Sequence, residues 1–242
     1  MSPTPLAKNF ARLKQVFNEY KITKPEQVFN IDESGFSTRT TSRSRAKAVF
    51  DAKGRSNSVE LNWATNAQQH VTMMAVVSAD GRAWSPLAVL PGKQAKFRKR
   101  HDGTRETPSM FLPPTAYCVY REKAGVDTDI FYHWGEKFVV ETSLLRKRHR
   151  NIILALDGYG AHCYYKVLQL FEDKNIVVVG LPAHTSHRTQ PLDFSVFYPY
   201  KTAFRNELNK STIFVKDETK NDVYTICELL TNAYNQEVTF KT

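Results

Sequence analysis

A short, continuous apolar run in the second half of the chain constrains the fold most. Residues 152–156 read IILAL, and the run stops at Asp157. Such a run, β-branched at its start, is typical of a strand buried on both faces of a parallel sheet. Asp157 then stands at the carboxyl end of the strand, where open α/β sheets present ligand-binding groups. Gly158 and Gly160 are expected to permit a sharp exit from the strand. The alternative is that Asp157 caps a helix or forms an Asx-turn.

The second half of the chain alternates between helix and strand patterns. Apolar residues at helical spacing cover residues 130–145, with Thr128 as the expected cap, and recur at 164–172 and at about 194–208. A second apolar strand pattern covers residues 176–182. This alternation predicts parallel strands that are joined by right-handed crossovers.

The first half of the chain contains strand patterns that are connected locally. A helix pattern at residues 6–20 precedes strand patterns at 28–32 and 46–52 and a hairpin at 71–90 that turns at residues 79–82. A three-strand antiparallel meander followed by parallel βα units is the element order of the ribonuclease H-like fold. We therefore expect an α/β protein whose mixed sheet is flanked by helices.

This order divides the chain into three predicted parts. They are a lead-in helix over residues 1–27, a ribonuclease H-like core over residues 28–210, and a C-terminal helical segment over residues 211–242 whose completeness the sequence leaves open. With 242 residues, of which 41% are hydrophobic, the chain can bury a substantial core.

Charge and cysteine content narrow the class of partner. Lys and Arg outnumber Asp and Glu by 34 to 24, and the resulting formal charge of +10 favours an acidic partner such as nucleic acid. Cys118, Cys163 and Cys227 show no CxxC spacing, so we expect neither a zinc site nor a disulfide framework. We therefore expect the protein to reside in a reducing compartment. No apolar run approaches the ~20 residues that span a bilayer, and the first residues lack the apolar core of a signal peptide. We expect an intracellular protein with no membrane association.

Three aspartates stand where the predicted elements begin or end. Asp32 closes the first strand pattern, Asp157 closes the later one, and Asp193 precedes the last helix pattern, where the alternative reading is a helix N-cap. The first and fourth strands of the predicted fold are neighbours, so Asp32 and Asp157 would lie side by side. Three acidic side chains at one place disfavour each other's ionised form, and a divalent cation would remove that conflict.

Three ordered motifs carry a resemblance to a known family. They are NIDESGF at residues 30–36, LDGYGAH at 156–162, and the segment 181–193, which contains LP, HTSH and QPLD. The hairpin turn at 79–81 and the PGK at 91–93 match in order. With these motifs the chain resembles the DDE superfamily endonuclease domain of pogo and Tigger-type transposases and of their jerky and centromere-protein-B relatives. The resemblance covers nearly the whole chain.

The resemblance implies phosphodiester chemistry at a pair of Mg²⁺ or Mn²⁺ ions. It implies Asp32 as the bridging ligand, with Asp157 and Asp193 each completing one metal site. The residues expected to support these ligands without binding metal are Glu33, His162 and Gln190.

The function implied is that of a nuclear enzyme that cleaves DNA and transfers strands. Transposases of this family carry a helix-turn-helix module upstream, and none is recognised ahead of Leu6, so we expect a catalytic domain that lacks that module. A homodimer is one option for its assembly. Two alternatives stay open: a catalytically silent, domesticated nucleic-acid-binding protein, and a protein-interaction scaffold that uses the same fold.

Two basic runs are the predicted phosphate contacts, with a solvated surface as the alternative for each. Their residues are Lys93, Lys96, Arg98, Lys99, Arg100, Arg146, Lys147 and Arg148. A third group that follows Asp32 and would line the same groove comprises Arg39, Arg43, Arg45 and Lys47. Phosphate contacts carry no sequence information, so we expect DNA binding without sequence preference.

Overall fold

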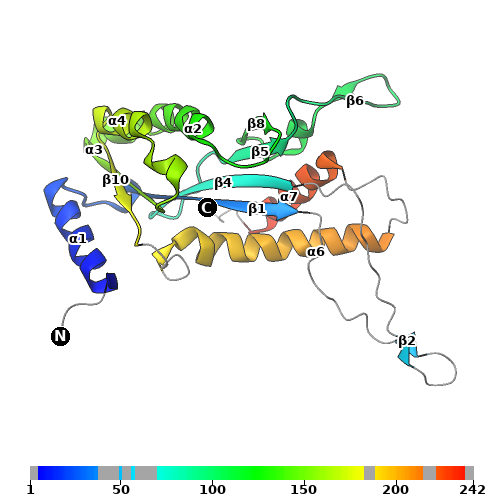
Figure 1. Cartoon of the computed structure of the whole chain (residues 1–242), viewed down its shortest axis with the longest axis horizontal. Helices are drawn as coiled ribbons and strands as arrows, with labels where there is room; N and C mark the ends of the chain where they lie inside the picture. The colour runs from blue at the N-terminus through cyan, green and yellow to red at the C-terminus, as the bar shows by residue number, and fades with distance from the viewer. Residues whose placement is uncertain are drawn as a thin grey trace.

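The computed structural model describes residues 5–37, 49–50, 56–57, 70–182, 189–214 and 222–237, and in these ranges a mixed sheet lies between helices (Figure 1). The strands are β1 Val28–Ser37, β2 Val49–Phe50, β3 Ser56–Asn57, β4 His70–Ser78, β5 Leu87–Pro91, β6 Arg98–Lys99, β7 Arg105–Glu106, β8 Tyr117–Arg121, β9 Ile152–Leu156 and β10 Ile176–Gly180. The α-helices are α1 Pro5–Glu19, α2 Thr128–Glu141, α3 Ser143–His149, α4 Tyr165–Asp173, α6 Tyr198–Phe214 and α7 Val223–Glu237. The shorter helices are η1 Pro25–Gln27, η2 Pro108–Phe111, η3 Gly160–Cys163 and the π-helix η4 Leu192–Phe197. The basic group Arg39, Arg43, Arg45 and Lys47 and the HTSH motif at 184–187 lie outside the described residues.

The main sheet has six strands in the order β10-β9-β1-β4-β5-β8. Strands β1, β4 and β5 are antiparallel neighbours, which is the predicted meander. Strand β9 pairs with β1 in parallel, and β10 pairs with β9 in parallel, so the first and fourth predicted strands are neighbours as expected. Strand β8 lies parallel to β5 at the other edge and was not predicted, because its half-buried residues YCVYR show no clear alternation. The predicted mixed α/β sheet is confirmed.

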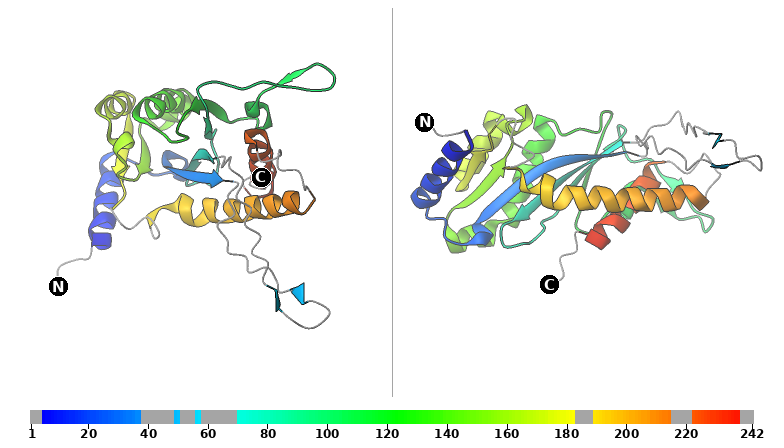
Figure 2. Two further views of the ribbon diagram at one scale, coloured as in Figure 1. Left: turned by 45° about the vertical axis from the view of Figure 1, so that its right-hand side comes forward. Right: turned by 90° about the horizontal axis from the view of Figure 1, so that it is seen from below.

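Helices cover both faces of the sheet (Figures 1 and 2). Helices α2, α3 and α4 lie on one face, where their apolar residues pack with Phe29 and Ile31 of β1. Helices α6 and α7 lie on the other face and pack with Phe36 of the same strand. Helix α1 lies along the β10 side of the sheet, where Ile22, Ile153 and Val179 form a smaller cluster. Successive side chains of β1 point to opposite faces, so Asp32 shares the face of Phe36.

The helix predicted over residues 130–145 is two helices. Helix α2 ends at Glu141 and α3 begins at Ser143, because the hydroxyl of the fully buried Thr142 donates to the carbonyl of Phe138 and the backbone turns at that residue. The N-cap is Asp127, whose carboxylate accepts from the amide of Ile130, and not the predicted Thr128. Pro, Gly or Asn would have signalled this break, and none stands there.

Gly135 lies in the middle of α2, where glycine is a poor helix former, and it has a packing reason there. A Cβ atom at this position would lie 3.1 Å from Val167 and 3.2 Å from Phe171, so the glycine allows α2 and α4 to approach closely. The loss of helix propensity, about 1 kcal/mol relative to alanine, is therefore exchanged for contact between the two helices.

The last predicted helix begins earlier and ends later than its pattern indicated. It starts as the π-helix η4 at Leu192 and continues as α6 to Phe214, so residue 210, the predicted end of the core, falls inside α6. Helix α7 contributes Ile226, Cys227 and Leu230 to the same hydrophobic cluster as α6. In the described residues α6 and α7 therefore pack as parts of one core.

Candidate active site

The pairing of β1 with β9 places two of the predicted catalytic aspartates side by side. Val28 lies opposite Ile153 and Asn30 lies opposite Ala155, an offset of 125 residues. The same offset relates Asp32 to Asp157. The carboxyl end of β9 and the middle of β1 therefore form one edge of the site.

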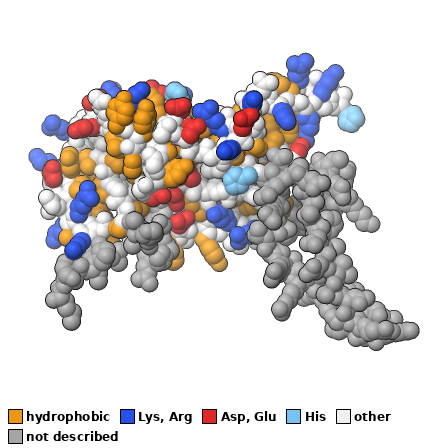
Figure 3. All heavy atoms as spheres, in the orientation of Figure 1, with side chains coloured by type: hydrophobic (Ala, Val, Ile, Leu, Met, Phe, Trp, Pro, Cys, Tyr) orange, Lys and Arg blue, Asp and Glu red, His pale blue; other side chains and the backbone are white. Residues whose placement is uncertain are grey.

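Asp32 lies in a buried and negatively charged environment. Its side chain is 8% exposed. Burial is the main cause that raises its pKa to about 7, and repulsion from Asp193, Glu33 and Asp157 raises it further, against one hydrogen bond donated by the amide of Glu33. Figure 3 shows acidic side chains gathered near the middle of this face. Asp193 and Asp157 are therefore near enough to Asp32 for their charges to act on its carboxyl group, and the role of the three aspartates as metal ligands stays a prediction.

A buried amide pair holds the segment that carries Asp193 against the sheet. Asn30 Nδ2 donates to Gln190 Oε1 at 2.6 Å and to the carbonyl of Ala155 at 3.1 Å. Asn30 Oδ1 accepts from the amide of Leu192 at 3.2 Å, and Gln190 Nε2 donates to the carbonyl of Ile31 at 3.3 Å. Asp193 is exposed in the first turn of η4, whose N-cap position is Pro191, so it is not the N-cap of this helix. A supporting role was predicted for Gln190, but nothing in the sequence indicated that Asn30 would be its partner.

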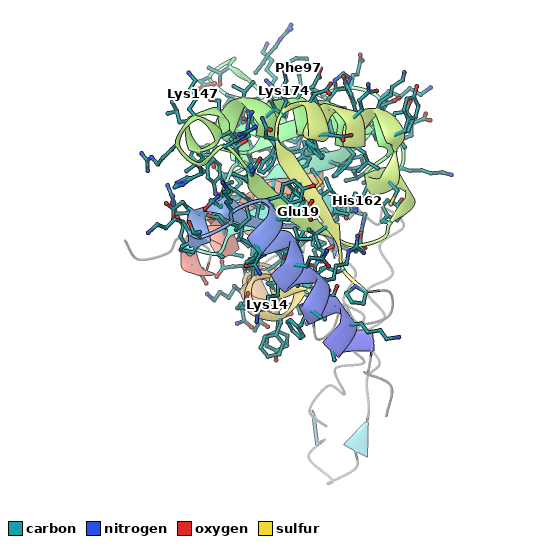
Figure 4. All side chains as sticks on the ribbon, turned by 90° about the vertical axis from the view of Figure 1, so that its left-hand side faces the viewer. Lys14, Glu19, Phe97, Lys147, His162 and Lys174 are labelled. Atoms are coloured by element: carbon teal, nitrogen blue, oxygen red, sulfur yellow. The ribbon has the colours of Figure 1, made fainter. Side chains whose placement is uncertain are left out.

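His162 connects Asp157 to Glu33 across the sheet. The imidazole is fully buried in η3, with Nδ1 2.7 Å from Asp157 Oδ1 and Nε2 2.8 Å from Glu33 Oε1, and it packs on the ring of Phe131. Figure 4 shows His162 between the α4 layer and the sheet. Burial lowers the pKa of His162, but the hydrogen bonds and charges of Glu33 and Asp157 outweigh it, so the pKa lies above its ordinary value. The histidine therefore orients the Asp157 carboxylate.

The turn after β9 has a different cause from the predicted one, which was the presence of two glycines. Neither Gly158 nor Gly160 has a positive φ, and a Cβ atom at either would meet nothing within 4 Å. The prediction that these glycines are sterically required is therefore wrong. The turn is instead closed by Asp157 itself, whose Oδ1 accepts from the amide of Tyr159 at 3.1 Å, as in the Asx-turn alternative.

The carboxylate groups of the site are suitable ligands for a divalent cation, although the side chains do not converge on one point. Within the described residues no three Asp, Glu, His or Cys side chains are arranged to hold a metal ion. Carboxylate oxygens are nevertheless the ligands that Mg²⁺ and Mn²⁺ prefer. Burial, followed by the charges of Asp193, Glu33 and Asp157, raises the pKa of Asp32, and a cation beside these carboxylates would offset the repulsion among them.

Comparison with known proteins identifies the family. The model of the DDE superfamily endonuclease family matches residues 67–240. This chain belongs to the DDE superfamily endonucleases. The match includes Asp157 and Asp193 and begins after Asp32, so the place of Asp32 in the site rests on the pairing of β1 with β9.

Two solved structures show the same fold as this DDE superfamily endonuclease. A pre-cleavage Mos1 transpososome has a TM-score of 0.53 and 11% identity, and covers 97% of this chain and 62% of that one. The mariner Mos1 paired end complex with Mg has a TM-score of 0.52 and 11% identity, and covers 98% of this chain and 62% of that one. The likeness shows the fold, and it confirms the predicted ribonuclease H-like fold.

A protein of Cochliobolus lunatus named MFS-type transporter clz9 is 25% identical over 183 residues. The aligned region is 76% of this chain and 18% of that protein, so the endonuclease chain spans less than a fifth of this relative. Among the described residues of the endonuclease, no helix is long and apolar enough to cross a membrane.

The first predicted phosphate-binding run of the endonuclease lies on and before the β6–β7 hairpin. Arg98 and Arg100 both pair with the buried Glu106, and the guanidinium of Arg98 also lies 4.4 Å from the ring centroid of Tyr224. Lys93 pairs with the exposed Glu122 at 3.2 Å. Lys96 and Lys99 are exposed. Part of the positive charge of this run is therefore compensated within the chain.

The second run lies far from the carboxylates. Helix α3 precedes the first residue of β9, five residues before Asp157, which is ~16 Å along a strand. Arg146 donates to the carbonyls of Lys174 and Val139, so its guanidinium is committed to the backbone. Lys147 and Arg148 are exposed. Their role as phosphate contacts stays a prediction, and Arg146 fits a structural role.

Asn30→Ala is expected to destabilise the endonuclease by about 2–4 kcal/mol. The change removes the hydrogen-bond partner of three buried groups, which are the carbonyl of Ala155, the side chain of Gln190 and the amide of Leu192. Chemical denaturation measures this free energy. Ser195→Ala is the control, since that exposed hydroxyl bonds only to the carbonyl of Pro191. Equal stability of the two variants would show that the amide pair does not hold η4.

Proposed function

We propose that this chain is the catalytic domain of a pogo/Tigger-type transposase that cleaves phosphodiester bonds of DNA and transfers strands with divalent cations. The observation that carries the proposal is the grouping of Asp157 and Asp193 around Asp32, whose pKa is raised by burial and by their charges. A structural role does not require three like charges at one place. The family match supports the same reaction class.

Each residue of the site has a defined task in this proposal. Two bound Mg²⁺ or Mn²⁺ ions would supply activation of the attacking hydroxyl and stabilisation of the leaving oxygen. Asp32, Asp157 and Asp193 would hold these ions. His162, braced by Glu33, keeps Asp157 in one orientation, and its buried ring excludes water behind that carboxylate. The amide pair of Asn30 and Gln190 fixes the start of η4 and with it Asp193.

The partner and the location follow from the same proposal. The chain has a charge of +10, which favours DNA held through its phosphates and without sequence preference. We propose a nuclear location, because the proposed substrate is DNA. Assembly as a homodimer is part of the proposal and is measured by sedimentation. We propose the same DNA cleavage and strand transfer for a longer protein that contains this chain.

Metal binding separates the catalytic proposal from that of a silent DNA-binding protein. Mn²⁺ at 100 times its dissociation constant is expected to stabilise the wild type by ~2.7 kcal/mol and to raise its melting temperature by roughly 5–10 °C. Asp157→Asn is expected to reduce the shift strongly, because it removes one ligand charge. Thermal scans with and without Mn²⁺ measure both. Shifts of equal size in the two proteins would leave no support for these carboxylates as ligands.

A further inference from the structure

The outward face of η4 and the first half of α6 exposes two aromatic rings beside the candidate active site. Phe194 is 81% exposed and Tyr198 is 72% exposed, while Phe197 and Tyr200 of the same helices are buried against the sheet. Residues four apart lie on the same side of a helix. The two rings therefore form one exposed apolar surface that begins directly after Asp193.

Two cations continue this surface along α6. Arg205 follows Tyr198 by seven residues, close to two helical turns, and so lies on the same side as the aromatic rings. Lys201 follows Asp193 by eight residues and lies on the side of that aspartate. Within the described part of the chain, no hydrogen bond or ion pair engages either side chain, whereas Lys210 further along pairs with Glu207. Figure 3 shows basic side chains directly beside the acidic group on this face.

Lys201 and Arg205 differ in this respect from several of the basic residues that the sequence singled out. Arg98 and Arg100 share the buried carboxylate of Glu106, and Arg146 is bound to backbone carbonyls. Lys201 and Arg205 therefore offer uncompensated positive charge within about three turns of Asp193. They did not stand out in the sequence because they occur singly and not as a run.

We propose that Phe194, Tyr198, Lys201 and Arg205, here called the α6 face, bind one nucleic-acid strand next to the cleavage site. The two rings stack on unpaired bases, and the two cations contact phosphates. This inference rests on the proposed endonuclease function. Exposed aromatic rings interleaved with cations are the chemistry of single-strand binding. Two copies of this basic face would repel each other, so a nucleic-acid strand fits it better than a second copy of the chain.

Fluorescence anisotropy with a labelled single-stranded oligonucleotide and the matching duplex, without divalent metal, tests the α6 face. Phe194→Ala with Tyr198→Ala is expected to weaken single-strand binding by roughly 30-fold or more, from ~1–3 kcal/mol for each of two stacked bases, and duplex binding much less. Lys201→Gln with Arg205→Gln is expected to lower the slope of log affinity against log salt by ~1.4, since each phosphate contact contributes ~0.7 on single strands.

The controls carry matched changes elsewhere on the surface. Tyr165→Ala removes an aromatic ring that is 63% exposed on α4, and Lys14→Gln with Lys174→Gln removes two exposed cations, one on α1 and one directly after α4. Both should bind the single strand like the wild type. The changed residues are exposed except for Lys201, which is partly buried, and thermal unfolding is expected to show intact folding in every variant.

Different experimental results would overturn the α6 face and the proposed function. Wild-type affinity in both α6 variants would overturn the α6 face and leave metal-dependent cleavage standing. Unchanged DNA affinity with an altered sedimentation coefficient in the aromatic variant would overturn it in favour of a protein interface. A wild type that binds no single strand at low salt would also overturn it, whereas failure of the proposed function itself would show as absent Mn²⁺ stabilisation.

Discussion

Asp193→Ala is expected to abolish metal-dependent nicking of supercoiled plasmid. The side chain stands exposed in the first turn of η4 and repels the buried carboxylate of Asp32, so it lies where a shared cation would be held. Loss of a metal ligand removes several kcal/mol of transition-state stabilisation, and each 1.36 kcal/mol is tenfold in rate. We therefore expect a fall of at least about 10³-fold in the initial rate with Mg²⁺ or Mn²⁺.

The matched control is Asp129→Ala, because Asp129 is also an exposed aspartate in the first turn of a helix, α2, on the other layer. Its nicking rate should equal that of the wild type, and EDTA should stop nicking in both. Nicking by Asp193→Ala at the wild-type rate would show that a different set of residues, or a contaminating nuclease, is responsible.

Asp32→Asn is expected to stabilise the metal-free protein, and to do so more at high pH. The pKa of Asp32 is raised from 3.8 to about 7 by burial and by the charges of Asp193, Glu33 and Asp157. The folded protein therefore binds this proton more tightly than the unfolded chain. The resulting contribution to stability is fully present below pH 3.8 and is lost as the pH rises through about 7. The loss is at most about 4 kcal/mol, since one pKa unit is 1.36 kcal/mol.

Urea denaturation in EDTA at pH 4 and pH 8 measures this effect. The difference in unfolding free energy between Asp32→Asn and the wild type should grow by several kcal/mol between the two pH values. Asp173→Asn, at the exposed end of α4, is the control and should show no such growth. A difference that stays constant with pH would show that Asp32 is not held in a buried, negatively charged place.

The order of elements could be predicted from the sequence because its patterns are local. The run at residues 152–156 and the hairpin around residues 79–82 are recognised from composition and turn residues, and both are present as β9 and as the connection of β4 to β5. Strand β8 and the break at Thr142 were missed. The strand carries no alternation, and the break depends on a hydrogen bond to Phe138 that common helix breakers do not announce.

The charges of Asp157 and Asp193 act on Asp32, but the residues that support these aspartates make contacts between distant parts of the sequence. Glu33 and His162 are 129 residues apart in sequence, and Asn30 and Gln190 are 160 apart. A single sequence contains no signal for such pairs. A basic run in the sequence does not by itself identify phosphate contacts, because Arg146 stands in such a run and is nevertheless bound to backbone carbonyls. A residue type predicts the chemistry that a side chain can perform, and its neighbours decide whether the side chain is free to perform it.

The proposed function requires that Asp32, Asp157 and Asp193 form one divalent metal site. A crystal of the protein soaked in Mn²⁺, with anomalous diffraction data, tests it most directly, because Mn²⁺ is located independently of the carboxylates. We predict anomalous density between the three side chains, with carboxylate oxygens at 2.0–2.3 Å, roughly the distances typical of such hard cations. Density at another place, or none between these aspartates while they are well ordered, would contradict the account.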